Sequence, residues 1–421
     1  MKSDKMVGVL RSQVVPVIGC TEPVSIAISV ATAKAQMKNR AEKVKVKLSV
    51  NILKNGMRVG IPGTNEKGIP FAIALALANG NGSADLSIFK DIEQDAIDKA
   101  HKIVDSGIIE IEAIEANKGF YIKTQLFSED EEVEVVIEDN HTNIISIKKN
   151  GFDIPFINVT TGSKNPNGYQ IEKLDDIYTF IEEVDIEKIA FLKEGVEMNL
   201  AIAEEGKNNP YCSALGPHLF SLIESGKVSN DILNRMKAYT ASGSDARMGG
   251  ANFPVMSSSG SGNHGLTAII PVAILAEELN SSEEELLRAL ALSHLITSYI
   301  KQKAGRLSPI CGCAIAAGIG ASAAMTYLQG GKKEQIDLAI LNMVGTLAGL
   351  ICDGAKGGCS FKLVTAVNEA YTQSLLALDG TSIALHDGIV GSNSDETIDN
   401  LGKLSQKGME QVDKFLVDIM L

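Results

Sequence analysis

The spacing of apolar residues changes near residue 170 and divides the chain into two unlike parts. Before that point, residues 44–53 and 118–149 contain short runs rich in β-forming residues, several of them alternating apolar with polar side chains. After it, apolar residues recur at helical spacing or form uncharged runs of helix length. These patterns predict an α+β protein, with a mixed α/β N-terminal domain that contains antiparallel strands and a mostly α-helical C-terminal domain.

The predicted boundary falls in a segment that favours turns. A run of Asn, Pro and Gly at residues 165–168 is typical of a linker. We therefore place the first domain at residues 1–170 and the second at residues 171–421. An early helix over residues 21–37 begins at Thr21, a good N-cap residue, and we expect this helix to pack on the helical domain.

The acidic composition argues against two classes of partner. The chain of 421 residues carries 52 acidic and 39 basic residues, for a formal net charge of -13. A negative surface repels nucleic acids and anionic membranes, so we expect neither as a partner. Two uncharged runs, at 310–329 and 338–352, are rich in Ala and Gly rather than in Leu, Ile and Phe, which predicts buried core helices instead of membrane spans.

The cysteines indicate a reducing compartment. The chain has six of them, too few and too sparse for a disulfide scaffold in a chain of this length. The first residues are polar and lack the pattern of a secretory leader, so we expect a cytoplasmic protein. The sequence leaves open whether the chain forms a homo-oligomer.

Four of the cysteines lie in Gly-rich loops at predicted helix ends. Cys311 and Cys313 precede an Ala- and Gly-rich helix, and Cys352 and Cys359 flank a six-residue loop. Thiolates in such loops are typical ligands of iron–sulfur clusters, and three of them leave one iron of a four-iron cluster open as a Lewis acid. A tetrathiolate zinc site competes with this interpretation but lacks paired Cys-x2-Cys spacing. Simple burial of the cysteines is the other alternative.

Cys20 is a candidate base or nucleophile. It comes directly before the predicted helix at 21–37, where backbone amides at the helix N-terminus lower the pKa of a thiol. A partly ionised thiol at this position would accept a proton or attack a substrate. The alternative is a small residue that only fills space in the core.

A second motif, S-S-S-G-S-G-N-H-G at residues 257–265, opens a predicted helix. Its consecutive amides and hydroxyls suit a carboxylate or a phosphate. His264 could be a base or could cap the loop. Positively charged residues elsewhere could hold a substrate carboxylate. The candidate substrate-binding residues are Lys54, Asn55, Arg247, Ser259, Gly260, Ser261, Asn263, His264 and Lys301.

The Ser/Gly loop resembles the phosphate cradle of pyridoxal-phosphate dehydratases. Those enzymes place their Schiff-base lysine upstream of the loop, in a Ser-Phe-Lys context. Here Ser360-Phe361-Lys362 lies downstream of the loop, beside a candidate iron ligand. The order of the motifs therefore disfavours a pyridoxal-phosphate enzyme.

Several motifs together resemble one family over nearly the whole chain. They are G-C-T-E-P, K-N-G-M-x-V-G-I-P-G-T, S-S-S-G-S-G-N-H-G, Y-I-K-x-x-x-G-R-L-S-x-x-C-G-C and C-D-G-A-K-x-x-C. This combination is similar to the L-cysteine desulfidase family, related to the α-chain of iron–sulfur L-serine dehydratase. The resemblance implies a helical catalytic domain that holds a four-iron cluster through three cysteines. It also implies cleavage of L-cysteine to pyruvate, ammonia and hydrogen sulfide.

The resemblance assigns roles to single residues. Cys352 and Cys359 match two cluster ligands, and the third is Cys313, with Cys311 as its alternative. Cys20 matches the proposed base of the family. With hydroxide as the leaving group, the same residues would make an L-serine dehydratase, and the sequence separates the two substrates poorly. A different class of protein, a non-catalytic cluster protein or amino-acid sensor, also stays open.

Overall fold

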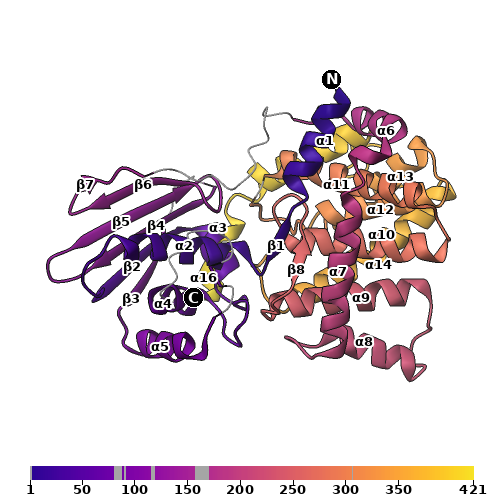
Figure 1. Cartoon of the computed structure of the whole chain (residues 1–421). Helices are drawn as coiled ribbons and strands as arrows, with labels where there is room; N and C mark the ends of the chain where they lie inside the picture. Colours follow the sequence, from indigo (N-terminus) through magenta and orange to yellow (C-terminus); the bar gives the residue numbers. More distant parts are fainter. Residues whose placement is uncertain (1, 80–87, 90–91, 115–118, 157–169, 306) are drawn as a thin grey trace.

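The computed structural model describes residues 2–79, 88–89, 92–114, 119–156, 170–305 and 307–421. Figure 1 shows two regions side by side, one built on a β-sheet and one built almost wholly of helices. We call residues 21–153 the sheet region and residues 174–408 the helical region. This arrangement confirms the predicted α+β fold class. The predicted linker at 165–168 lies outside the described residues, and the domain boundary at residue 170 stays a prediction.

The described strands of the sheet region form a six-stranded mixed sheet in the order β3-β2-β4-β5-β6-β7. β2 pairs with β3 in parallel, and the other neighbours are antiparallel. In β2, Val44, Val46 and Leu48 are fully buried, whereas the lysines between them face outwards, where Lys47 pairs with Glu112 of β3. The bounds are β2 Lys43–Ser49, β3 Ile109–Ile114, β4 Tyr121–Phe127, β5 Glu132–Glu138, β6 Ile144–Lys149 and β7 Phe152–Asp153.

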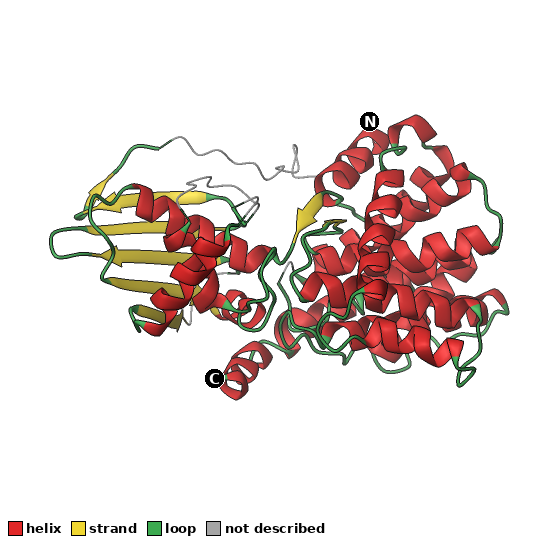
Figure 2. Cartoon of the chain, turned by 60° about the horizontal axis from the view of Figure 1, so that its bottom comes forward, coloured by secondary structure: helices red, strands yellow, loops and turns green. Residues whose placement is uncertain are grey.

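Helices cover one face of this sheet, as Figure 2 shows. α2 packs on β4 and β5, and α4 packs on α2. The side chains of Ile26, Ile28 and Val30 on α2 are fully buried in the same core as the strands. The bounds are α2 Thr21–Ala35, α3 Val50–Gly56, α4 Ile69–Ala78 and α5 Gln94–Asp105.

The position of α2 corrects one expectation. The helix predicted at 21–37 forms, but it packs on the sheet and not on the helical region. The helix that packs on the helical region is instead α1 (Lys2–Gln13), which buries Met6 and Leu10 against α6 and α11. α2 is apolar on nearly all sides, so its sequence does not show which neighbour will cover it.

The strand predicted at 44–53 is also shorter than expected. β2 ends at Ser49, and residues 50–56 form the short helix α3 instead of continuing the strand. The alternation of apolar residues stops after Leu48, because Ile52 and Leu53 are adjacent and both buried. This helix carries Lys54 and Asn55.

The helical region surrounds a second apolar core. α11 packs against α10, α12 and α15, and α12 packs in addition against α13 and α14. The uncharged runs at 310–329 and 338–352 contribute to the buried helices α12 and α13, and no helix among the described residues is long and apolar enough to cross a membrane. The bounds are α6 Leu174–Glu183, η1 Ile186–Lys188, α7 Leu192–Asn208, α8 Leu215–Glu224, α9 Ile232–Met248, α10 Gly262–Glu278, α11 Glu283–Ala304, α12 Ala316–Leu328, α13 Lys333–Leu347, α14 Cys359–Leu378, α15 Ser394–Lys403 and the π-helical turn η2 Leu404–Gly408.

Among the described residues, two elements link the regions. β1 (Pro16–Ile18) pairs antiparallel with β8 (Pro254–Met256), so the segment that leads into α2 runs beside the segment that leads into α10. The late helix α16 (Val412–Met420) returns to the sheet region, where it packs on α3 and buries Val417 in the sheet core. Loops from both regions therefore meet at one place.

Candidate active site

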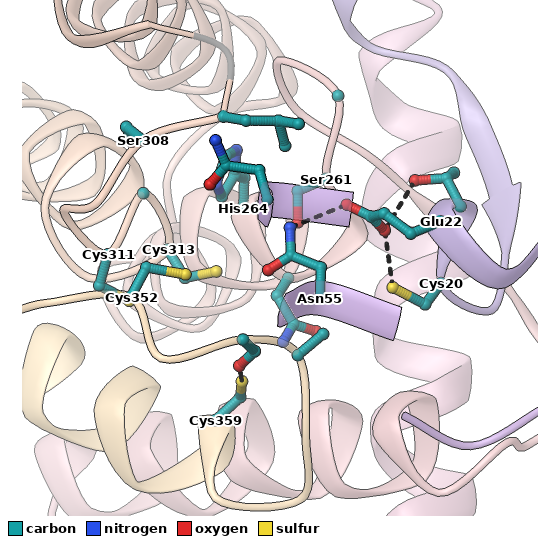
Figure 3. Close-up of a pocket in the computed structure, with 18 of the residues that line it drawn as sticks. Cys20, Glu22, Asn55, Ser261, His264, Ser308, Cys311, Cys313, Cys352 and Cys359 are labelled. Carbon is teal, nitrogen blue, oxygen red and sulfur yellow. Dashed lines mark hydrogen bonds between the residues drawn. The ribbon is translucent and has the colours of Figure 1, made fainter. Parts of the chain in front are cut away.

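A pocket lies where the two regions meet (Figure 3). Its cavity volume is about 100 Å³. All of the residues singled out from the sequence line this one pocket, although they are spread over more than 300 positions of the chain. They are Cys20, Lys54, Asn55, Arg247, Ser259, Gly260, Ser261, Asn263, His264, Lys301, Cys311, Cys313, Cys352 and Cys359.

One side of the pocket, which we call the thiol wall, consists of Cys311, Cys313, Cys352 and Cys359. Two backbone hydrogen bonds hold its loops side by side. The amide of Cys311 donates to the carbonyl of Leu350 at 2.8 Å, and that of Cys352 donates to the carbonyl of Pro309 at 2.7 Å. The short antiparallel bridge between these loops brings together cysteines that lie about forty residues apart in the sequence.

The thiols of this wall influence one another. The Cys313 thiol donates a hydrogen bond to the Cys311 sulfur, which lowers the pKa of Cys311 and raises that of Cys313. Burial, together with the nearby Cys311 sulfur, raises the pKa of Cys359 to about 12. Lys362 favours an ionised Cys311 from the other side. Buried thiolates repel one another, and a bound cation would relieve this repulsion.

Two glycines allow the loops to come close. A Cβ atom at Gly312 would lie 2.4 Å from Nε2 of His264, and one at Gly354 would lie 2.3 Å from the carbonyl oxygen of Lys54. Both distances are too short for a side chain. The glycines therefore permit the cysteine loops to pack directly against the Ser/Gly loop and against α3.

The Ser/Gly loop follows β8 and enters α10. The amides of Ser257 and Ser259 donate to the carbonyls of Val15 and Gln13, at 2.9 and 3.0 Å, so the β1 segment holds the loop in place. α11 supports it from behind, where His294 Nδ1 contacts the Ser258 hydroxyl at 2.9 Å. The N-terminus of α10, a 17-residue helix, thus faces the pocket, where its free amides favour a negatively charged group.

His264 lies in the first turn of α10 and is buried. Its Nδ1 lies 3.0 Å from the carbonyl oxygen of Ser258, which fixes the proton on that nitrogen. Burial, with the positive charge of Lys301, lowers the pKa of His264 to about 3. The imidazole is therefore neutral near pH 7, with the lone pair of Nε2 facing Gly312.

The predicted carboxylate clamps are engaged with the protein. Arg247 donates to the carbonyl of Gly19 at 2.8 Å and to Oδ1 of Asn263 at 3.1 Å, so it ties the loop before α2 to α10. Lys54 donates to the carbonyl of Cys352 at 2.9 Å and pairs with Asp413 at 2.5 Å. Both side chains brace the walls of the pocket.

The opposite side of the pocket, which we call the acid–base wall, consists of Cys20, Glu22 and Asn55. The Cys20 thiol donates to Oε2 of Glu22 at 2.9 Å, and the Asn55 amide donates to Oε1 at 3.0 Å. Cys20 does precede a helix, but its pKa is not lowered as expected. Burial and the Glu22 carboxylate raise the pKa of Cys20 well above its ordinary value, and Arg247 opposes them only in part.

The candidates chosen from the sequence leave out several residues of the pocket. Glu22 belongs to G-C-T-E-P, yet only Cys20 of that motif was selected, and His141 was not selected either. Both line the pocket, as does Asp353, which pairs with Lys356 and Lys362. The signal for Glu22 was available, since an acidic residue two positions after a candidate base is within reach of its side chain. Nothing local marked His141.

The fold and the pocket define an α+β protein in which a helical region presents several thiols, and a sheet region presents acid–base groups, to a common small cavity. Residues 83–418 match the family model described as "Serine dehydratase alpha chain". The chain belongs to this family, and the membership indicates a dehydratase or related lyase.

Relatives cover the whole chain. A UPF0597 protein of Clostridium tetani (strain Massachusetts / E88) is 40% identical over 99% of this chain and 98% of its own length. Another UPF0597 protein, from Clostridium perfringens (strain ATCC 13124), is 41% identical over 98% of this chain and 96% of its own. The similarity therefore includes both walls of the pocket.

The family is generally iron–sulfur dependent, so the thiol wall is the place where a cluster would bind. Among the described residues, no three His, Cys, Asp or Glu side chains converge on a point as ligands of a single metal ion. A cluster makes a different demand, because each cysteine binds a separate iron. Four interacting thiols in Gly-rich loops at one cavity fit that demand.

Proposed function

We propose that the protein is a lyase that cleaves L-cysteine to pyruvate, ammonia and hydrogen sulfide by β-elimination. Cys313, Cys352 and Cys359 would hold a four-iron, four-sulfur cluster, with Cys311 as the alternative to Cys313. The observation that carries the proposal is the common pocket, where the thiol wall faces Cys20 and the Ser/Gly loop.

The cluster would supply a Lewis-acidic iron that draws negative charge from the substrate. The protein's own residues do the rest of the work. The α10 N-terminus and the hydroxyls of Ser259 and Ser261 offer donors to the substrate carboxylate. Arg247 holds Asn263 and the loop before Cys20 in place, so the two sets of groups keep a fixed distance.

Elimination requires removal of the proton on Cα, and Cys20 is the proposed base. Its side chain lines the pocket opposite the thiol wall, so a bound amino acid would lie between them. Removal of the proton and departure of the β-thiol leave aminoacrylate, which hydrolyses to pyruvate and ammonia. General base catalysis of such a step typically contributes about 10²–10⁴-fold to the rate.

The family description favours a second substrate, L-serine, with water as the leaving product. The parts of the pocket would serve both reactions, because only the leaving group differs. His264 is neutral and buried, and the cations Lys54 and Arg247 brace the walls of the pocket. The preference for L-cysteine or L-serine therefore depends on the group that receives the leaving sulfur or oxygen.

An anaerobic assay tests both. The protein is reconstituted with iron and sulfide, and pyruvate is measured with L-cysteine, L-serine and their D-enantiomers, with and without pyridoxal phosphate. We expect pyruvate from L-cysteine that depends on iron and not on pyridoxal phosphate. Pyruvate from L-serine alone would make the protein a serine dehydratase, and pyruvate from neither would support a sensor or other non-catalytic role. Activity that requires only pyridoxal phosphate would contradict the proposed role of the cluster.

A further inference from the structure

Cys20 can act as a base only after its thiol has lost a proton. A base must be unprotonated when the substrate binds, yet burial and the neighbouring carboxylate keep this thiol protonated. The side chain is only 4% exposed, so bulk water has little access to its proton. Another group in the pocket has to receive it.

The geometry offers one such group. Oε2 of Glu22 lies 2.9 Å from the Cys20 sulfur, within hydrogen-bond distance, and Glu22 is itself only 7% exposed. Figure 3 shows the two side chains pointing toward each other, with Asn55 on the other side of the carboxylate. The Asn55 amide donates to Oε1 at 3.0 Å, and the Thr21 hydroxyl donates to Oε2 at 3.3 Å.

Resting on the proposed function, we propose that Glu22 is the proton acceptor that makes Cys20 a base. The Sγ–H bond of Cys20 breaks and its proton forms an O–H bond with Oε2 of Glu22. The thiolate then takes the proton from the substrate Cα, the electron pair of the Cα–H bond forms the Cα–Cβ double bond, and the β-sulfur leaves with the Cβ–S pair. The proton on Glu22 passes to the departing sulfide or to water, which restores the resting pair. Glu22 acts through Cys20 and is therefore a positioning residue.

Glu22 is ionised in the resting pocket. Burial opposes its ionisation, but the positive potential of His141 and the donors at Cys20 and Asn55 outweigh burial and hold the pKa of the carboxyl below its usual range. Oε2 is therefore unprotonated in the resting pocket and free to accept a proton. Because the pKa of Cys20 is raised and that of Glu22 is lowered, the transfer is uphill, so the thiolate forms only transiently, as the substrate proton is removed. The charged and titratable groups that face the pair are His141, from the loop before β6, and Arg247, from α9.

Glu22→Gln tests the proposal, because glutamine keeps the size of the side chain and loses the proton acceptor. We expect kcat to fall about 10²–10⁴-fold with little change in KM. The pH profile should also change. Without the carboxylate, the thiolate forms only by loss of its proton to solvent, so the remaining activity should rise with pH through the alkaline range. A merely structural role would lower the rate equally at all pH values.

Glu131→Gln is a matched control. Glu131 is also little exposed, at 9%, and pairs with Lys149, but it lies in the turn between β4 and β5 and does not line the pocket. We expect this variant to keep kcat and the pH profile. Circular dichroism and the cluster absorbance show whether each variant is folded and loaded.

A second measurement isolates proton removal from elimination. L-alanine has no leaving group, so exchange of its α-hydrogen in deuterated water, followed by NMR, reports the base alone. Glu22→Gln and Cys20→Ala should both lose this exchange. An active wild type together with normal kcat, pH profile and exchange in Glu22→Gln would overturn the role of Glu22 and leave the lyase intact. A wild type inactive on both amino acids would overturn the lyase itself and the role of Glu22 with it.

Discussion

The two walls of the pocket differ in how many hydrogen bonds their side chains make within the protein. On the acid–base wall, both oxygens of Glu22 accept hydrogen bonds, from Cys20, Thr21 and Asn55. On the thiol wall, Cys311 and Cys313 bond to each other, and Cys359 makes a long contact of 3.6 Å with the carbonyl of Gly354. The hydrogen bonds of the first wall are satisfied within the protein. On the second wall, the hydrogen bond from Cys313 lowers the pKa of Cys311, and the Cys311 sulfur in turn raises the pKa of Cys313 and of Cys359.

The difference indicates that the walls have separate tasks. A network of paired acid–base groups is suited to move a proton, and its geometry does not depend on a bound group. Crowded thiols are suited to bind a cation, which favours their ionised form. Substitutions in the thiol wall should therefore remove the cluster, whereas substitutions in the acid–base wall should lower kcat and keep the cluster.

The largest effect is expected on the thiol wall. Cys352→Ser should abolish the cluster absorbance and the activity together, because serine is a poor ligand for iron. The matched control is Cys212→Ser, since Cys212 is exposed and does not line the pocket. Visible spectroscopy and iron analysis after anaerobic reconstitution measure the effect. Full cluster content in Cys352→Ser would remove this residue from the ligands.

The acid–base wall should behave differently. Cys20→Ala should keep the cluster absorbance and lose about 10²–10⁴-fold in kcat, because the base is gone while the thiol wall is unchanged. Activity and absorbance are measured on the same sample. If the absorbance fell in parallel with the activity, the two walls would not be independent.

A third test weakens the brace between the walls. Lys54 is 1% exposed and pairs with Asp413, so Asp413→Asn leaves a buried ammonium without a charged partner. We expect a loss of about 1–3 kcal/mol in the free energy of unfolding, and a weaker cluster because Lys54 also binds the Cys352 carbonyl. Glu110→Gln, which breaks exposed pairs with Lys43 and Lys45, should cost less than about 1 kcal/mol. Equal losses in denaturant titrations would contradict burial of the pair.

The smallest effect should come from outside both walls. Ser282 caps α11 in a reciprocal arrangement with Glu285. Ser282→Ala should cost about 1 kcal/mol in stability and leave kcat, cluster content and the pH profile unchanged. Thermal unfolding and the standard assay measure both properties. A fall in kcat here would show that general destabilisation, and not loss of a wall, also explains the larger effects.

The sequence predicted much of the fold, because the periods of its apolar residues differ between the regions. It also identified the groups now seen to line the pocket, through cysteines and glycines whose chemistry is unusual in loops. It did not predict which neighbour α2 would cover, because that helix is apolar on nearly all sides. It also missed the end of β2 at Ser49, where a short apolar stretch fits a strand and a helix equally well.

The electrostatics of the pocket were the least predictable part. The position of Cys20 before a helix favoured a lowered pKa, but the structure adds burial and the Glu22 carboxylate, which act the other way. His141 comes from a distant loop, and Arg247 faces the backbone instead of the cavity centre. Such effects depend on which side chains meet in space, and local sequence does not contain that information.

The return of α16 to the sheet region has a consequence for biosynthesis. Val417 fills part of the sheet core and Asp413 neutralises Lys54, yet both residues are made long after the strands. During translation, the core of the sheet region is therefore completed only after α16 has been synthesised. Until then Lys54 lacks the carboxylate of Asp413, and the sheet core lacks the side chain of Val417.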